Sequence, residues 1–236
     1  MDQTTTAALA AAALGVLGAA TYFSPAVLKR NRLNALRRQT ADKRTICLTY
    51  DDGPSSRLTP RLLEMLRKRN CRATFFMLGL NAHQHPLIVD QVIREGHDVG
   101  CHSDQHLNAW KSTPWKAIAD IKAGYDRLSP WIRPSGMFRP PYGKMTLPTY
   151  CAVRWRGAPV WWWTIDSGDT HNVLPSPVKV TDKVREASGG IVLMHDGSID
   201  FRAQERNDFV LELTEALLDL AEREALCIVP LSELCI

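Results

Sequence analysis

The run from Thr45 to Tyr50 is mostly apolar and ends in Asp51-Asp52-Gly53-Pro54. An apolar run followed by Gly-Pro predicts a buried strand that stops at a tight turn. Neighbouring side chains of a strand point in different directions, so one carboxylate can bind a metal ion while the other faces a substrate water. Two adjacent negative charges are unfavourable unless a cation compensates them. Asp-Asp-Gly-Pro is also a good turn, and the motif alone leaves both interpretations open.

A second polar cluster, His102-Ser103-Asp104-Gln105-His106, favours the metal. On one helical turn the side chains at i and i+4 share a face, so His102 and His106 can bind one ion. With one Asp they form a set of three protein ligands and an open position, which is typical of a catalytic zinc site.

Ionisable residues also stand at or near the ends of three later apolar runs. They are Arg139 in Arg139-Pro140-Pro141-Tyr142-Gly143, Asp169 at the end of the stretch 161–169, and His195 in the stretch 191–197. Polar groups gathered at the ends of successive strands are where an α/β barrel keeps its active site.

Strand-like apolar runs alternate with amphipathic helical segments after residue 44. Strands are expected at 45–50, 73–78, 98–102, 136–139, 159–165, 190–195 and 226–230, and helices at 60–68, 86–94, 113–128, 177–187 and 209–223. This alternation predicts one α/β domain with a parallel sheet covered by helices. The net charge of +4 is modest and does not argue for a nucleic-acid partner.

In this order, the motifs TYDDGP, HSxxH, RPPYG, DSGD and LMH resemble those of the polysaccharide deacetylases, the NodB-homology domain of carbohydrate esterase family four. The resemblance covers Arg44 to Ile236. It implies a distorted (β/α) barrel, here of about seven strands. It also implies an enzyme, a metal-dependent N-deacetylase of carbohydrates that hydrolyses a carbon–nitrogen bond other than a peptide bond.

The resemblance implies a metal triad and a catalytic base. The expected ligands of one divalent ion are Asp52, His102 and His106. Zn²⁺ is the preferred ion, and Co²⁺, Mn²⁺ and Ni²⁺ are alternatives. Asp51 is the expected base. Such an ion lowers the pKa of a water towards 7 and polarises a carbonyl, which is what amide hydrolysis requires.

The other motif residues match supporting roles in the family. Arg139 orients the base, and Asp169 tunes His195, the general acid. The backbone N–H of Tyr142 faces the oxyanion, and Leu193 forms the wall of the acyl pocket. The chemistry of amide hydrolysis requires the same roles, because the departing nitrogen needs a proton and a carboxylate partner raises the pKa of a histidine for that task.

Two positions depart from the family pattern, and one aromatic run admits two interpretations. Leu107 stands where a proline usually follows the HxxxH motif, and Thr170 where a tryptophan supports the acyl pocket. The run Trp161–Trp163 resembles a sugar-stacking platform, but the core is the favoured place for one or two of its rings, with at most one lining a cleft. Trp163 is the candidate for substrate contact.

Residues Ala7 to Phe23 carry no charge, and the uncharged stretch from Thr4 to Leu28 is long enough to span a bilayer. We expect a transmembrane anchor over 1–28, a basic juxtamembrane linker over 29–43 and a catalytic domain over 44–236. A cleavable signal peptide is the competing interpretation, although the acidic n-region fits it poorly. A water-soluble helix is the third interpretation.

The basic residues that follow this stretch indicate a single-pass cell-membrane protein with its domain on the cytoplasmic face. The alternative is the extracytoplasmic side, where most of the family works. Six dispersed cysteines without a CxxC motif favour a reducing compartment.

The predicted function is membrane-anchored, metal-dependent removal of an N-acyl group, N-acetyl in the first place, from an amino sugar in a glycan or a lipid-linked saccharide. The partners expected are this substrate and the membrane, and no oligomeric state is predicted. A deformylase or another amide hydrolase acting on a lipid-linked sugar is one alternative, because Thr170 alters the acyl-pocket neighbourhood. A non-catalytic carbohydrate-binding protein of the same fold is the other.

Overall fold

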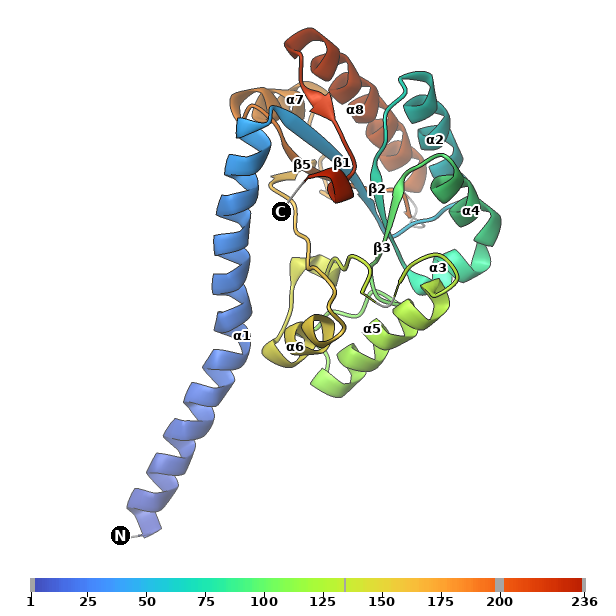
Figure 1. The fold of residues 1–236 in the computed structure, drawn as a ribbon. Coiled ribbons are helices and arrows are strands. Elements are labelled where there is room, and N and C mark those ends of the chain that lie inside the picture. Colours follow the sequence, from blue (N-terminus) through green and yellow to red (C-terminus); the bar gives the residue numbers. More distant parts are fainter. Residues whose placement is uncertain (1–2, 134, 198–201, 235–236) are drawn as a thin grey trace.

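A six-stranded parallel sheet forms the centre of the computed structural model, which describes residues 3–133, 135–197 and 202–234 (Figure 1). The strands are β1 (Thr45–Asp51), β2 (Thr74–Met77), β3 (Asp98–Cys101), β4 (Ile165–Asp166), β5 (Gly190–His195) and β6 (Cys227–Ile228). Their order is β3-β2-β1-β5-β4, and β6 pairs with the start of β1. The predicted parallel α/β architecture is confirmed.

The register of the sheet brings two predicted catalytic residues together. Strand β1 pairs with β5 from Ile46 to Asp51, and the partner of Asp51 is His195. Both strands run in the same direction, so their carboxyl ends meet at one edge of the sheet. Side chains from both strand ends therefore gather there.

Two of the predicted strands are much shorter than expected. In the range 136–139 only Phe138 pairs, through isolated parallel bridges to Cys101 and Val160, and the range 159–165 keeps Val160 and the start of β4. Pro140 and Pro159 flank these bridges, and a proline has no N–H to donate to a ladder. In place of the predicted barrel of about seven strands, the structure has a sheet of six strands. Single bridges at Phe138 continue this sheet beyond its edge strand β3.

Helices cover this sheet, in agreement with the predicted alternation. They are α1 (Gln3–Asp42), α2 (Thr59–Lys68), α3 (Gly79–Gln84), α4 (Pro86–Arg94), α5 (Pro114–Leu128), α6 (Leu147–Trp155), α7 (Pro177–Glu186) and α8 (Ala203–Glu224), with 3₁₀ turns η1 (Pro141–Gly143) and η2 (Leu231–Glu233). Pro86, Pro114 and Pro177 are the first residues of α4, α5 and α7, where a missing N–H costs nothing.

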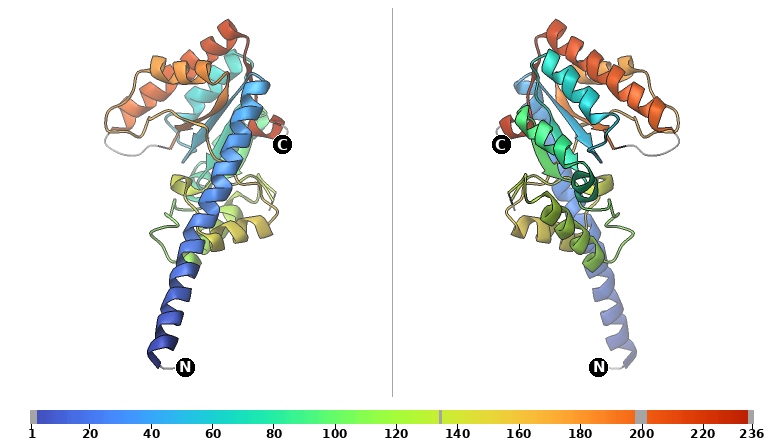
Figure 2. Two further views of the ribbon diagram at one scale, coloured as in Figure 1. Left: turned by 90° about the vertical axis from the view of Figure 1, so that its left-hand side faces the viewer. Right: turned by 90° about the vertical axis from the view of Figure 1, so that its right-hand side faces the viewer.

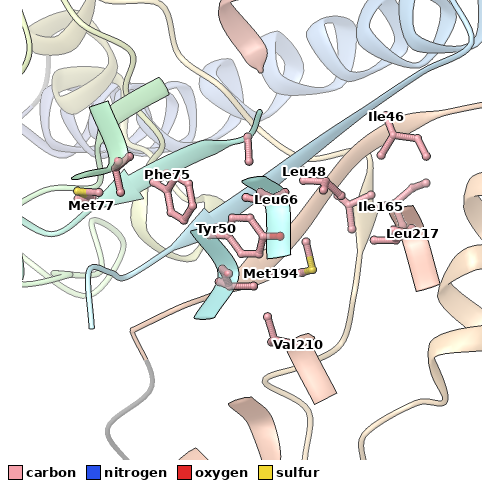
Figure 3. Close-up of a cluster of buried hydrophobic side chains, with 14 of the residues drawn as sticks. Ile46, Leu48, Tyr50, Leu66, Phe75, Met77, Ile165, Met194, Val210 and Leu217 are labelled. Atoms are coloured by element: carbon pink, nitrogen blue, oxygen red, sulfur yellow. The ribbon is translucent and has the colours of Figure 1, made fainter. Parts of the chain in front are cut away.

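The larger core lies between one face of the sheet and helices that include α2 and α8 (Figure 3). On β1 the residues of this face alternate along the strand: Ile46, Leu48 and Tyr50 are fully buried. They pack with Leu66 of α2 and Leu217 of α8. The remaining positions of β1, which include Asp51, therefore face the other side of the sheet.

A second apolar cluster lies on that other side and includes helix α1. Leu36 of α1 is fully buried in one cluster with Cys47, Phe76, Trp161 and Ile191. The helix contacts β1, β5 and α6, and its N-terminal end extends away from the sheet (Figures 1 and 2). The C-terminal half of α1 is thus part of the α/β core.

The structure contradicts the predicted single-pass membrane localisation. Within the residues that it describes, no helix is both long enough and apolar enough to cross a membrane. Most side chains of Ala7 to Phe23 lie outside the described residues. The predicted anchor continues without a break into residues 29–42, and the described side chains there, Lys29, Arg32 and Leu36 among them, pack against the rest of the protein. One helix also runs through the predicted boundary at residue 28.

Replacing Leu36 with Ala tests whether α1 is part of the core. The change leaves a cavity at a fully buried position, so we expect the free energy of unfolding to fall by about 2–4 kcal/mol. Leu87→Ala is the matched control, because Leu87 is 78% exposed and should lose less than about 0.5 kcal/mol. Urea unfolding measures both, and equal values for the two variants would show that α1 does not pack on the sheet.

Candidate active site

Asp52, His102 and His106 converge beyond the carboxyl end of β1. Their ligand atoms all lie within 4.8 Å of one another. Oδ1 of Asp52 is 3.4 Å from Nε2 of His102 and 3.4 Å from Nε2 of His106. In the part of the chain that the structure describes, these three side chains form the only such cluster of His, Cys, Asp and Glu.

The chemistry of this cluster fits a divalent cation. Nδ1 of His102 lies 2.8 Å from the carbonyl oxygen of Arg139, which can only accept, so Nδ1 carries the proton and Nε2 keeps a lone pair. Burial holds the pKa of His102 well below its usual value, and it also lowers the pKa of His106. Oδ1 of Asp52 is buried without a hydrogen-bond donor. A carboxylate oxygen between two neutral imidazoles is a typical ligand set of zinc.

The two histidines lie on a loop, so the predicted helical i, i+4 geometry was wrong. Ser103 and His106 adopt left-handed backbone conformations, with φ of 68° and 60°. The Ser103 hydroxyl accepts from the N–H of His106 at 3.1 Å. The carboxylate of Asp120 on α5 accepts from the N–H groups of Gln105 and Leu107 at 2.9 and 3.2 Å. These bonds hold the loop in a shape that a helix would not permit.

Asp51 and Arg139 form a buried ion pair next to this cluster. Nη1 of Arg139 donates to Oδ1 of Asp51 at 2.8 Å and to the Thr49 hydroxyl at 2.7 Å. Burial raises the pKa of Asp51 to about 6, although the charge of Arg139 opposes this rise. The guanidinium also lies over the ring of Phe76, 4.2 Å from its centroid. The carboxylate is therefore held in one orientation at the end of β1.

His195 and Asp169 form a second pair at the same edge. Nδ1 of His195 lies 2.9 Å from Oδ1 of Asp169, and the backbone N–H of His195 donates to Oδ2 at 2.7 Å. Burial by itself lowers the pKa of His195. The charge and hydrogen bond of Asp169, with smaller contributions from Asp52 and Asp51, outweigh burial and raise this pKa to about 10. The imidazole is thus oriented and stabilised in its protonated form.

The loop at Tyr142 borders the cluster of Asp52, His102 and His106. Tyr142 has a φ of 57°, which is uncommon for a residue with a side chain, and its ring lies 4.4 Å from that of His106. The carbonyl of Gly143 accepts from Nζ of Lys29 at 3.1 Å and from the indole of Trp162 at 3.2 Å. Helix α1 and the tryptophan run therefore hold this loop together.

The remaining predicted site residues lie deeper. Leu193 on β5 is buried, 4% exposed, and Trp161 and Trp162 are 2% and 3% exposed. Two of the three indoles therefore belong to the core. Trp163 is partly buried, with Nζ of Lys29 5.2 Å from its ring centroid. Its contact with substrate stays a prediction, as does the acyl-pocket role of Leu193.

Asp196 was not among the predicted site residues. It supports the turn that follows β1, because its backbone N–H donates to the carbonyl of Asp51 at 3.0 Å. It is fully buried, accepts from the Thr59 hydroxyl at 2.6 Å, and has a pKa raised by burial to about 7. A Cβ on Gly53 would lie 2.2 Å from its carboxylate, so only glycine fits there. Its place directly after His195 was the available signal. Lys29 and Asp120 offered none, because they reach the site from distant segments.

Comparison with known proteins places these features in one family. The family model of the polysaccharide deacetylases matches residues 38–161. A peptidoglycan-N-acetylglucosamine deacetylase of Bacillus cereus is 34% identical over 185 residues, which cover 77% of this chain and 84% of the relative. A chitooligosaccharide deacetylase of Bradyrhizobium is 30% identical over 173 residues, or 70% and 78% of the two chains. The deacetylase PgdA of Listeria monocytogenes is longer, and the match covers 32% of it at 38% identity.

Solved structures agree with these relatives. The peptidoglycan N-acetylglucosamine deacetylase Bc1960 superposes with a TM-score of 0.72 at 26% identity, over 82% of this chain and 89% of that one. A family 4 carbohydrate esterase from Streptomyces lividans, in complex with acetate, gives a TM-score of 0.65 at 26% identity, over 78% and 91%. The chain belongs to the polysaccharide deacetylase family, as its five motifs indicated.

Proposed function

We propose that this hydrolase is a metal-dependent N-deacetylase of N-acetylglucosamine units in a glycan, with residues 44–236 as its catalytic domain. The observation that carries the proposal is the convergence of the Asp52, His102 and His106 cluster with two buried pairs at one sheet edge. The relatives support the substrate class, since they are named for peptidoglycan N-acetylglucosamine and for chitooligosaccharides.

The three clustered side chains would hold one divalent ion, with Zn²⁺ the best match to two imidazoles and a carboxylate. When bound, such an ion polarises the amide carbonyl and lowers the pKa of a water. The buried, neutral imidazoles need no deprotonation to act as ligands.

Asp51 acts as the base. Its carboxylate takes a proton from the water that attacks the amide carbon, and the ion pair with Arg139 keeps it oriented for this step. The backbone N–H of Tyr142, on the loop tied down by Lys29, donates to the oxyanion that develops on the carbonyl oxygen. Leu193 bounds the methyl side of the acetyl group.

His195 acts as the acid. Asp169 keeps it protonated near neutral pH, and it donates that proton to the nitrogen as the carbon–nitrogen bond breaks. The products are acetate and a free amino sugar. Release of acetate from N-acetylglucosamine oligomers tests the whole proposal, and an N-formyl substrate run in parallel tests the deformylase alternative.

The metal ligands are tested by removing one imidazole at a time. His102→Ala and His106→Ala should each abolish tight zinc binding, because two remaining ligands do not complete a stable site. Metal content after dialysis, measured by mass spectrometry, checks this. His83→Ala, on the exposed face of α3, is the matched control and should retain zinc. Undiminished zinc in both test variants would place the site elsewhere.

Asp51→Asn and His195→Ala separate chemistry from binding. Each variant should keep zinc, because neither side chain belongs to the cluster, and each should lose about 10²-fold or more in kcat. Acetate release, together with metal content and a melting curve to confirm folding, measures the effect. A near-normal kcat in Asp51→Asn would reject this residue as the base.

Asp169→Asn should move the alkaline limb of the pH–rate profile. His195 must be protonated to act, and its raised pKa keeps it so until the pH rises through that value. Removing the carboxylate charge lowers this pKa, so activity should be lost at a lower pH than in the parent enzyme. Asp166→Asn, at an exposed position of β4, is the control. An alkaline limb that stays in place in Asp169→Asn contradicts the role of His195.

A further inference from the structure

Two adjoining pockets run between helix α1 and the segment from Trp110 to Val160. The first, of about 240 Å³, is lined by Lys29 of α1 and by Trp110, Tyr142 and Lys144. The second, of about 390 Å³, is lined by residues that include Arg32, Tyr150 and Arg154. Trp162 is a wall of both pockets, and we refer to the two together as the α1 groove.

The α1 groove is positively charged. None of the residues that line either pocket is acidic, whereas each pocket has two basic residues. Nζ of Lys29 donates to a carbonyl and lies over the ring of Trp163, and the guanidinium of Arg32 lies over Trp161. Burial and the neighbouring Lys144 lower the pKa of Lys29, and burial and Arg154 do the same for Arg32. Like charges held this way are stabilised by an anion between them.

The α1 groove begins at the candidate active site. Tyr142 lines its first pocket and packs with its ring against His106, one of the clustered imidazoles. The side chains of Trp110 and Tyr142 are 45% and 54% exposed, which leaves aromatic faces for contact with sugar rings. A glycan with one unit at the metal cluster would therefore place a flanking unit in the groove.

On the basis of the proposed deacetylase function, we propose that the α1 groove binds the flanking part of a glycan that carries carboxylate groups. Helix α1 thereby makes the enzyme prefer an anionic chain to a neutral one. The α1 residues that line the groove precede residue 38, where the family match begins. The other two basic residues of the groove, Lys144 and Arg154, lie within that match.

Two glycans of equal length test the preference. One is a neutral oligomer of N-acetylglucosamine, and the other is the same oligomer with carboxymethyl groups on its primary hydroxyls. We expect a higher kcat/KM for the carboxymethylated glycan. Lys144→Gln and Arg154→Gln should each lower the ratio of the two kcat/KM values by roughly 2- to 5-fold, as for a partly exposed ion pair. Added salt should lower the ratio as well.

Lys179→Gln is the matched control, because it removes one charge from the exposed face of α7, away from the groove. It should leave the ratio unchanged. Equal kcat/KM values for both glycans in the parent enzyme would overturn the proposal, and so would an unchanged ratio in both groove variants.

Calorimetry with oligogalacturonate separates this proposal from the deacetylase function, because that chain carries carboxylates and no N-acetyl group. It should bind the parent enzyme and bind at least about 5-fold more weakly to the Lys144→Gln/Arg154→Gln double variant, because two partly exposed charge contacts are lost. Binding of oligogalacturonate that the double variant weakens, without acetate release from either glycan, would overturn the proposed deacetylase function and support the proposed groove. Acetate release with equal oligogalacturonate affinity in both proteins would overturn the groove and leave the deacetylase.

Discussion

Arg139 is the residue on which the geometry of the site depends. It is fully buried, and its guanidinium donates to Asp51 and Thr49 at the end of β1. Its carbonyl accepts from the ring of His102, and its N–H donates to the carbonyl of Cys101. One residue thus connects the proposed base, a proposed metal ligand and the sheet. A buried charge is expensive to leave unpaired, so this arrangement tolerates few alternatives.

The backbone has unusual conformations at and beside the cluster of Asp52, His102 and His106. Asp52, Ser103, His106 and Tyr142 all have positive φ values although none is glycine. Such conformations cost free energy, and they persist because the surrounding structure holds them. Here that support comes from side-chain hydrogen bonds, including those of Asp120 to the histidine loop. These strained loops at the edge of the sheet hold the ligand atoms of Asp52, His102 and His106 within 4.8 Å of one another.

Helix α1 contacts both the core and the loop beside the site, whereas its composition predicted a membrane anchor and a linker. Leu36 fills the core on the Asp51 side of the sheet. About two helical turns before it, Lys29 reaches the carbonyl of Gly143, next to the proposed oxyanion donor. The helix therefore stabilises the domain and shapes the surface beside Tyr142. Hydropathy alone does not show that Lys29 and Leu36 contact the domain, because those contacts are made with segments far away in the sequence.

The sequence by itself determined the parallel α/β class, most element positions and the two clustered histidines with an acid from the Asp51-Asp52 pair. Those inferences rest on local patterns, such as the acids that follow β1, whereas the choice of Asp52 over Asp51 rested on the resemblance to the family. Only the tertiary structure decided that the histidines lie on a loop and that the predicted strand 136–139 is reduced to single bridges at Phe138. It also decided that Lys29, Asp120 and Asp196 contact the site or its loops. These outcomes depend on contacts between segments far apart in sequence, whose packing and hydrogen bonds outweigh local preference.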